Sequence, residues 1–125
     1  GYMDALTGSD IRVNDDNIIW FTTENKRSVE LQLNITRLIT DCTAVVCYND
    51  EIALQVLDYL LVHPGSSITA MRSFDKTFTP RQSIDFKSFC HPKERLGQRT
   101  AERIFSIIDG KKEENLIMPW ECDEE

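Results

Sequence analysis

Apolar and polar residues follow one another along the chain in blocks that predict strands and amphipathic helices in turn. Compact apolar runs at 17–22 and 43–48 are typical of buried strands. Between these runs, apolar residues recur at helical spacing and form one stripe, made of Leu31, Ile35, Leu38 and Ile39. The first half of the chain therefore predicts the order strand, helix, strand.

The same alternation continues through the middle of the chain. A helix is predicted over 50–62 and ends before Pro64 and Gly65. Its buried face is predicted to consist of Ile52, Ala53, Val56, Leu57, Leu60 and Leu61. Further strands are predicted over 67–71 and 84–89. Alternating strands and helices imply right-handed crossovers, so we predict an α/β domain with a mainly parallel sheet and helices on both faces.

The two ends of the chain add shorter or more exposed elements. Residues 1–6 are typical of the tail of a helix that ends near Thr7 and Gly8. Pro92 opens a last helix that Gly110 ends, and 116–118 can form a final strand. The last helix has one face formed by Gly97, Ala101, Ile104, Phe105 and Ile108. With 125 residues and no linker, the chain fits one domain.

Charge and composition exclude several classes of function. Lys and Arg number 14 against 21 Asp and Glu, giving a net charge of -7 without a basic stripe, which argues against direct nucleic-acid binding. The chain has no apolar run of membrane-spanning length and does not open with a secretory signal. We therefore expect a cytoplasmic protein that does not contact a membrane.

Neither cysteine spacing nor glycine motifs point to a bound metal or cofactor. The cysteines form no CxxC pair and have no His at ligand spacing, so no metal site is expected. The GxGxxG, GxxxxGK[ST] and GxSxG motifs are also missing, so we expect no dinucleotide cofactor and no hydrolase elbow. Cys47 is predicted to be a reduced thiol in the core, while disulfides stay possible.

The junction between residues 43–48 and 50–62 carries the best candidates for ligand binding. Ligands of open parallel sheets bind at the carboxyl ends of the strands, where a helix start also offers free N-H groups. Asn49 and Asp50 occupy that junction and are candidate contacts for a small polar molecule. For Asp50, stabilisation of the helix start is an equal alternative.

Two histidines complete the candidate chemistry. His63 precedes Pro64 at a helix end, where a capping role is expected. His91 follows Cys90, and such a pair invites a nucleophilic interpretation. Adjacent residues of an extended segment point to opposite sides, however, so we expect His91 to contribute to a polar pocket instead.

Two motifs resemble a known family. TAVVCYNDEIALQVLDYL at 43–60 and HPKERLGQRTAERIFSIIDGK at 91–111 resemble, in the same order, the effector-binding domain of lactose-repressor-type transcription regulators. The combination of CYND with HPKERLG is most similar to arabinose-repressor-like proteins, which join such a sensor to a winged-helix DNA-binding domain. The resemblance implies that residues 1–125 form the C-terminal lobe of a periplasmic-binding-protein-like (type I) sensor. The first lobe and the DNA-binding domain would be absent from this chain.

The resemblance also implies roles for individual residues. Asn49 matches the position that hydrogen-bonds effector hydroxyls, and Asp75 matches the first acid of the family's GYDD or GFDD turn. Phe21 falls near an aromatic wall position, and an aromatic ring can stack on a sugar. An amide donates and accepts while a carboxylate only accepts, which suits vicinal hydroxyls. The sequence at 73–76, SFDK, departs from the family turn, because it lacks the preceding Gly and the second acid.

The implied assembly is a homodimer that binds an operator through the missing domain. Leu54, Asp58 and the segment 79–84 match regions that contribute to the dimer interface, although an exposed Leu54 alone is common. We therefore expect the sugar-sensing lobe of a bacterial repressor rather than an enzyme. One alternative is a transport-associated sugar-binding protein with the same bilobal fold. Another is an α/β enzyme that uses Asp75 or the pair Cys90 and His91.

Overall fold

A four-stranded sheet lies at the centre of the computed structural model, which describes residues 1–80 and 84–122. Strands β1 (Ala44–Val46), β2 (Ala70–Phe74) and β3 (Asp85–Cys90) are parallel neighbours in that order. The short β4 (Glu121–Cys122) pairs antiparallel with β3. The prediction of an α/β fold with a mainly parallel sheet is confirmed.

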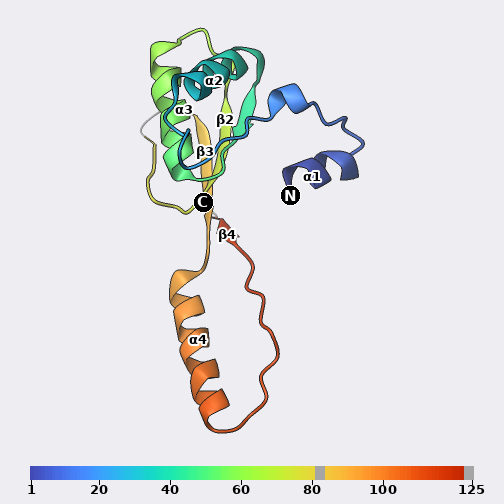
Figure 1. The fold of residues 1–125 in the computed structure, drawn as a ribbon, viewed down its shortest axis with the longest axis vertical. Helices are drawn as coiled ribbons and strands as arrows, with labels where there is room; N and C mark the ends of the chain where they lie inside the picture. Colours follow the sequence, from blue (N-terminus) through green and yellow to red (C-terminus); the bar gives the residue numbers. More distant parts are fainter. Residues whose placement is uncertain (81–83, 123–125) are drawn as a thin grey trace.

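Helices α2 (Val29–Asp41) and α3 (Asp50–Val62) supply most of the core against this sheet (Figure 1). Each begins at a polar cap: the Ser28 hydroxyl accepts from Leu31 N, and Asn49 Oδ1 accepts from Ile52 N. The buried apolar cluster consists of Leu31, Ile35, Ile39, Cys47, Ile52, Ala53, Val56, Leu57 and Met71. We call this unit, residues 29–90 as far as they are described, the body.

The apolar faces predicted for these two helices are largely correct. Leu31, Ile35 and Ile39 are buried on α2, and four of the six residues predicted for α3 are buried. In the last turn of α3, Leu60 is half-buried and Leu61 is 65% exposed. Cys47 is a buried free thiol, as predicted.

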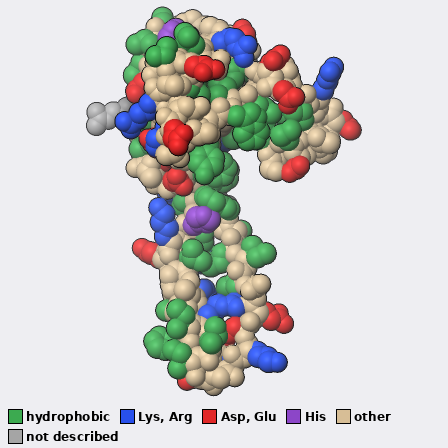
Figure 2. All heavy atoms as spheres, viewed as in Figure 1, with side chains coloured by type: hydrophobic (Ala, Val, Ile, Leu, Met, Phe, Trp, Pro, Cys, Tyr) green, Lys and Arg blue, Asp and Glu red, His purple; other side chains and the backbone are tan. Residues whose placement is uncertain are grey.

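Helix α4 (Lys93–Ile108) extends away from the body, and residues 109–120 return beside it to β4 (Figure 1). We call residues 93–120 the arm. The predicted helix limits are confirmed, with Pro92 at the start and Gly110 at a positive φ of 80° beyond the end. None of the described residues of α4 is buried, and hydrophobic side chains lie open along the arm (Figure 2).

The N-terminal region lies outside the body as well. Helix α1 (Tyr2–Gly8) ends where the sequence predicts, and it contains no buried residue. A single 3-10 turn, η1 (Asp15–Asn17), follows, and the Asn14 side chain caps it by accepting from Asp16 N. Among the described residues, no helix is both long and apolar enough to cross a membrane.

Two predicted strands are wrong. Residues 18–22 belong to none of the described strands: Ile19 and Phe21 pack on the core while Trp20 is 82% exposed, so burial alternates without a paired neighbour. Thr22 N bonds to Asn25 Oδ1, which turns the chain toward α2 before a ladder forms. Residues 116–118 are also unpaired, and Ile117 is 91% exposed. Pro119, which has no N-H, precedes the pairing at Glu121.

Strand β2 is displaced along the chain from the strand predicted over 67–71. The prediction covers 67–71, whereas β2 begins at Ala70 and continues to Phe74. Residues 66–69 instead anchor the strand's start, since Thr69 N and Ala70 N both approach Thr43 O. β2 therefore extends past Arg72, the register partner of the last residue of β1, and ends directly before Asp75.

Candidate functional site

The carboxyl ends of β1, β2 and β3 meet at one edge of the sheet. β1 leads to Asn49, β2 leads to Asp75 and β3 leads to His91. Because the three strands are parallel neighbours, the candidates from three segments are gathered at this edge. The structure then separates them into distinct surroundings.

A pocket of about 520 Å³ lies at the β1 end of this edge, and we call it the edge pocket. It is lined by Ile19, Trp20, Phe21, Thr22, Thr23, Lys26, Tyr48, Asn49, Glu51 and Ile52. The rings of Phe21 and Tyr48 meet edge to face with centroids 6.2 Å apart. Two predicted ligand residues from separate segments, Phe21 and Asn49, therefore share one pocket.

Asn49 has a structural role that also orients its amide. Its Oδ1 accepts a 3.1 Å hydrogen bond from Ile52 N at the start of α3. Because the oxygen faces the helix, the amide nitrogen faces away from it. In the described part of the chain no hydrogen bond reaches that nitrogen, so a donor remains for a ligand.

Charged side chains beside the edge pocket are paired with one another. Lys26 Nζ lies 2.9 Å from Glu51 Oε2, and Arg27 Nη2 lies 3.5 Å from Glu51 Oε1. The hydrogen bond from Lys26 is the main cause that lowers the pKa of the Glu51 carboxyl below its ordinary value. Glu51 is thus ionised at neutral pH and pairs with two basic side chains near the start of α3.

Asp50 is placed differently from Asn49, since it is only 1% exposed. Its Oδ2 accepts from Thr77 N at 2.6 Å and from Thr77 Oγ1 at 3.1 Å, and its Oδ1 accepts from Ser88 Oγ at 2.7 Å. Burial alone would raise the pKa of the Asp50 carboxyl, but these hydrogen bonds outweigh burial and lower it. Burial, followed by the charge of Asp50, raises the pKa of the Cys47 thiol to about 12.

Asp75 begins a turn with unusual backbone geometry. Asp75 and Lys76 have φ values of 95° and 48°, in the left-handed region that favours glycine. Asp75 N donates to Phe89 O at 2.8 Å, and Asp75 O accepts from Lys93 Nζ at 3.4 Å. The Asp75 side chain is exposed and does not line the edge pocket.

His91 lies at the far end of the edge, against an aromatic side chain from the end of the arm. Its ring is 3.7 Å from that of Trp120, at an angle of 35°. Trp120 also meets Phe74 edge to face at 5.4 Å. His91 therefore belongs to an aromatic cluster and does not line the edge pocket.

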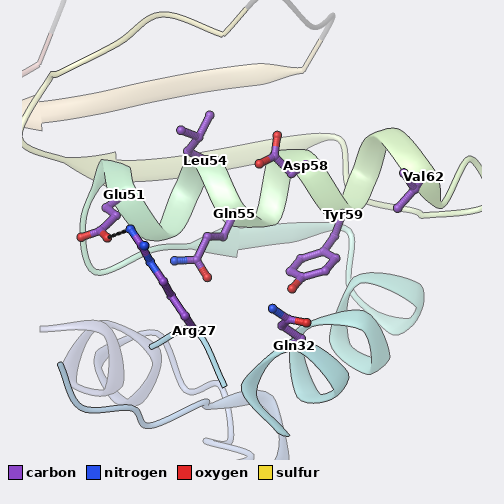
Figure 3. A pocket seen from close by; sticks show the side chains of 8 residues that line it. All are labelled: Arg27, Gln32, Glu51, Leu54, Gln55, Asp58, Tyr59 and Val62. Carbon is purple, nitrogen blue, oxygen red and sulfur yellow. Dashed lines mark hydrogen bonds and ion pairs between the residues drawn. The ribbon is translucent and has the colours of Figure 1, made fainter. Parts of the chain in front are cut away.

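The two predicted interface residues lie on the exposed side of α3. Leu54, which is 49% exposed, and Asp58 line a second pocket of about 450 Å³. Figure 3 shows both side chains projecting from α3, with Arg27 and Gln32 contributed from the chain around the start of α2. Residues 81–83 of the predicted interface segment 79–84 lie outside the described residues. Across the described residues, no group of three or more His, Cys, Asp or Glu could hold a metal ion.

Known proteins similar to this chain are regulators of transcription. No family model matches the sequence. The arabinose metabolism transcriptional repressor of Halalkalibacterium halodurans is 27% identical over 121 residues, which cover 91% of this chain and 32% of that protein. The repressor of the same name from Geobacillus stearothermophilus is 30% identical over 79 residues, covering 59% of this chain and 21% of that protein. The predicted resemblance to arabinose-repressor-like proteins is confirmed.

Solved structures of transcription regulators share the fold. A transcription regulator from Staphylococcus saprophyticus superposes with a TM-score of 0.71 at 16% identity, over 99% of this chain and 48% of that one. The Escherichia coli transcriptional repressor AscG superposes with a TM-score of 0.62 at 22% identity, over 89% and 41%. The chain thus spans about a third or less of the curated relatives and under half of these structures.

Several residues of the edge escape prediction from the sequence. Tyr48, 76% exposed, and Trp20 line the edge pocket although both lie in runs that predict buried strands. Trp120 reaches His91 only because β4 pairs with β3 across a long return segment. A Trp just before a short strand gives no periodic signal, so only the fold reveals this contact.

Proposed function

We propose that the chain is the C-terminal lobe of the effector-binding domain of a bacterial transcription repressor, and that its edge pocket binds a sugar effector. The first lobe and the DNA-binding domain would come from the remainder of a longer protein. The observation that carries this proposal is the meeting of Phe21 and Asn49 in one pocket at the carboxyl edge of the sheet. The similarity to arabinose metabolism repressors supports it.

The chemistry of the edge pocket suits a sugar. A volume of about 520 Å³ is within the range of ordinary small-molecule sites. Phe21, Tyr48 and Trp20 offer aromatic surface to the C-H face of a pyranose, and the Asn49 amide nitrogen can donate to a hydroxyl. We extend the proposed contact surface to Asp75 and His91, which end the neighbouring strands, because a bound sugar enclosed by a second lobe would span this edge.

Regulation would follow from differential binding. A sugar that binds the closed arrangement of two lobes more tightly than the open one shifts the protein toward closure. If the two arrangements hold the DNA-binding domains differently, the sugar changes operator affinity by the same coupling free energy. The net charge of -7 is in keeping with operator contacts made by another domain. No chemical step is required, and the protein would act in the cytoplasm as a regulator rather than as an enzyme.

Dimerisation through the exposed side of α3 is part of the proposal. Leu54 and Asp58 line a pocket on that side, and a half-exposed Leu beside charged residues suits the centre of a small interface. We expect Leu54→Asp to convert the full-length protein from dimer to monomer in light scattering. A dimer of unchanged mass would contradict this assignment.

Calorimetry with arabinose on the full-length protein tests the sugar site. Asn49→Ser keeps a side-chain oxygen for the cap, because Ser and Asn are comparable caps, but removes the amide donor. We expect this variant to bind arabinose on the order of tenfold more weakly, with the midpoint of unfolding lowered only slightly. Ser66→Ala, which removes the hydrogen bond from the Ser66 hydroxyl to Ile39 O, is a control expected to leave the affinity unchanged. No heat from the unaltered protein with arabinose or related sugars would overturn the proposed sugar.

A further inference from the structure

A single buried carboxylate joins three elements of the edge. Asp50 is the first residue of α3, Thr77 follows β2, and Ser88 lies within β3. Asp50 accepts hydrogen bonds from the Thr77 N-H and hydroxyl and from the Ser88 hydroxyl, while its side chain is withdrawn from solvent. A carboxylate placed only to stabilise the helix start would need neither of these partners. Glu51 already supplies exposed negative charge in the first turn of the helix.

The turn held by these bonds is not one that its residues favour. Asp75 and Lys76 both have positive φ, a conformation sparsely populated by residues other than glycine. Such a conformation persists only where the surrounding structure holds it. The backbone of the turn is anchored at successive residues: Asp75 N donates to Phe89 O at 2.8 Å, and Lys76 N donates to Ser88 Oγ at 2.9 Å. Thr77 N then donates to Asp50.

The hydrogen bonds form a continuous relay that ends on Asp50. The Ser88 hydroxyl accepts from Lys76 N and donates its own proton to Asp50 Oδ1. Thr77 N reaches the other oxygen of the same carboxylate. Because both carboxylate oxygens are occupied and buried, Asp50 has little capacity left for a direct ligand contact.

We propose that Asp50 is a positioning residue, which locks the Asp75–Lys76 turn to the start of α3 and so fixes Asp75 relative to Asn49. This inference rests on the proposed function for its meaning, since Asn49 and Asp75 are the polar contacts proposed for the sugar. Their spacing would then depend on a residue that never touches the sugar. Such support of a binding group by a second layer of hydrogen bonds is a general requirement for precise recognition.

Hydrogen exchange tests the lock without any ligand. Ser88→Ala removes the middle of the relay but keeps the carboxylate and its bond to Thr77 N, so this variant is expected to fold. We expect amide exchange at Lys76 and Thr77 to accelerate on the order of tenfold, with unchanged exchange in α2. Asp50→Asn should have the larger effect, and Ser66→Ala, a hydroxyl deletion at the opposite end of the sheet, should have none at the turn. Unchanged exchange at the turn in Ser88→Ala, or a uniform rise throughout the protein, would overturn the proposal.

Arabinose binding by the full-length protein then tests the consequence. We expect Ser88→Ala and Asp50→Asn to raise the Kd several-fold and about tenfold, with the stoichiometry of binding unchanged. A merely structural role would lower the stoichiometry, because part of the protein would be unfolded, but would leave the Kd of the folded part as it was. That result would overturn the positioning role. If the unaltered protein binds no sugar, the proposed function fails, while the exchange experiment still decides whether Asp50 locks the turn.

Discussion

Helices α3 and α4 both carry apolar residues at helical spacing, although α3 is the more apolar of the two, and they end in opposite surroundings. α3 has 13 residues, of which five are buried, whereas α4 has 16 residues and none is buried. The limits of both helices agree closely with those expected from the sequence. The comparison teaches that helical spacing of apolar residues predicts the helix, whereas the presence of a partner for its apolar face depends on the rest of the fold.

The contacts of the two helices explain this difference. α3 packs Ile52, Val56 and Leu57 into the core with α2 and the sheet. α4 instead pairs basic residues with acidic residues that follow it in the chain, since Arg95 pairs with Glu121 of β4 at 2.9 Å and Arg103 approaches Glu113 of the return segment at 4.0 Å. Its apolar face points to solvent: Phe105 is 68% exposed and Ile108 is 72% exposed. Burial stabilises the body, while partly exposed ion pairs, each worth little, connect α4 to the residues that follow it.

The largest expected effect comes from the core of α3. Leu57 is 2% exposed, so Leu57→Ala removes buried contacts and leaves a cavity. We expect the free energy of unfolding to fall by about 2–5 kcal/mol, measured by urea denaturation. Ile104→Ala on α4 is the matched change, and we expect it to cost less than about 0.5 kcal/mol because Ile104 is 52% exposed. Equal losses in the two variants would show that the apolar face of α4 is packed.

The second expected effect is on the way stability falls in acid, which depends on Asp50 at the start of α3. The folded-state pKa of Asp50 lies below its ordinary value of 3.8, so its contribution to stability is complete above that pH. The contribution is lost as the pH falls through the lower, folded-state value. Asp50→Asn should therefore cost about 1–3 kcal/mol at pH 7 through impaired buried hydrogen bonds, and should flatten the decline in stability below pH 4. Denaturation measured between pH 2 and pH 7 decides this, and an equally steep decline in the variant would contradict it.

A smaller effect is expected at the helix starts. α3 is capped by Asn49, whereas Pro92 at the start of α4 makes no side-chain cap bond. Asn49→Ala should cost about 1 kcal/mol in urea denaturation, and Asn49→Ser only a few tenths, because Ser restores an acceptor for Ile52 N. A loss of the same size in both variants would mean that the Asn49 amide nitrogen, rather than its oxygen, stabilises the folded state.

The body could be predicted from the sequence because its patterns are local. The apolar spacing of α2, the run before Asn49 and the alternation of β3 each follow from residues near in sequence. The segments 17–22 and 116–118 were predicted wrongly because an apolar run fits a strand only where another strand is free to pair with it. That condition is set by distant parts of the chain. For the same reason, the pattern of α4 could not reveal that its apolar face would stay exposed.

The residues of the candidate site likewise divide into those placed by the local sequence and those placed by long-range contacts. The position of Asn49 was predictable because a polar residue between a strand and a helix lies at the sheet's carboxyl edge. Asp50 adjoins Asn49 in sequence, yet its contacts with Thr77 and Ser88 span 27 and 38 residues, so its burial had no local signal. Trp120 reaches His91 through a pairing of similar range. Contacts made by the topology, rather than by neighbours in sequence, account for what the patterns missed.

The smallest expected effect comes from a substitution that stabilises α4 and should leave the stability of the body unchanged. Gly97 lies within α4, and a Cβ added there would meet no atom within 4 Å. Gly97→Ala should therefore stabilise the helix locally by about 0.5–1 kcal/mol, since alanine loses less backbone freedom. This gain in free energy should slow amide exchange within α4 about two- to fivefold. The urea midpoint reported by the body should stay unchanged, because no described residue of α4 is buried or belongs to the core cluster. A rise in that midpoint would show instead that body and arm unfold as one unit, and that the contrast between α3 and α4 is confined to solvent exposure.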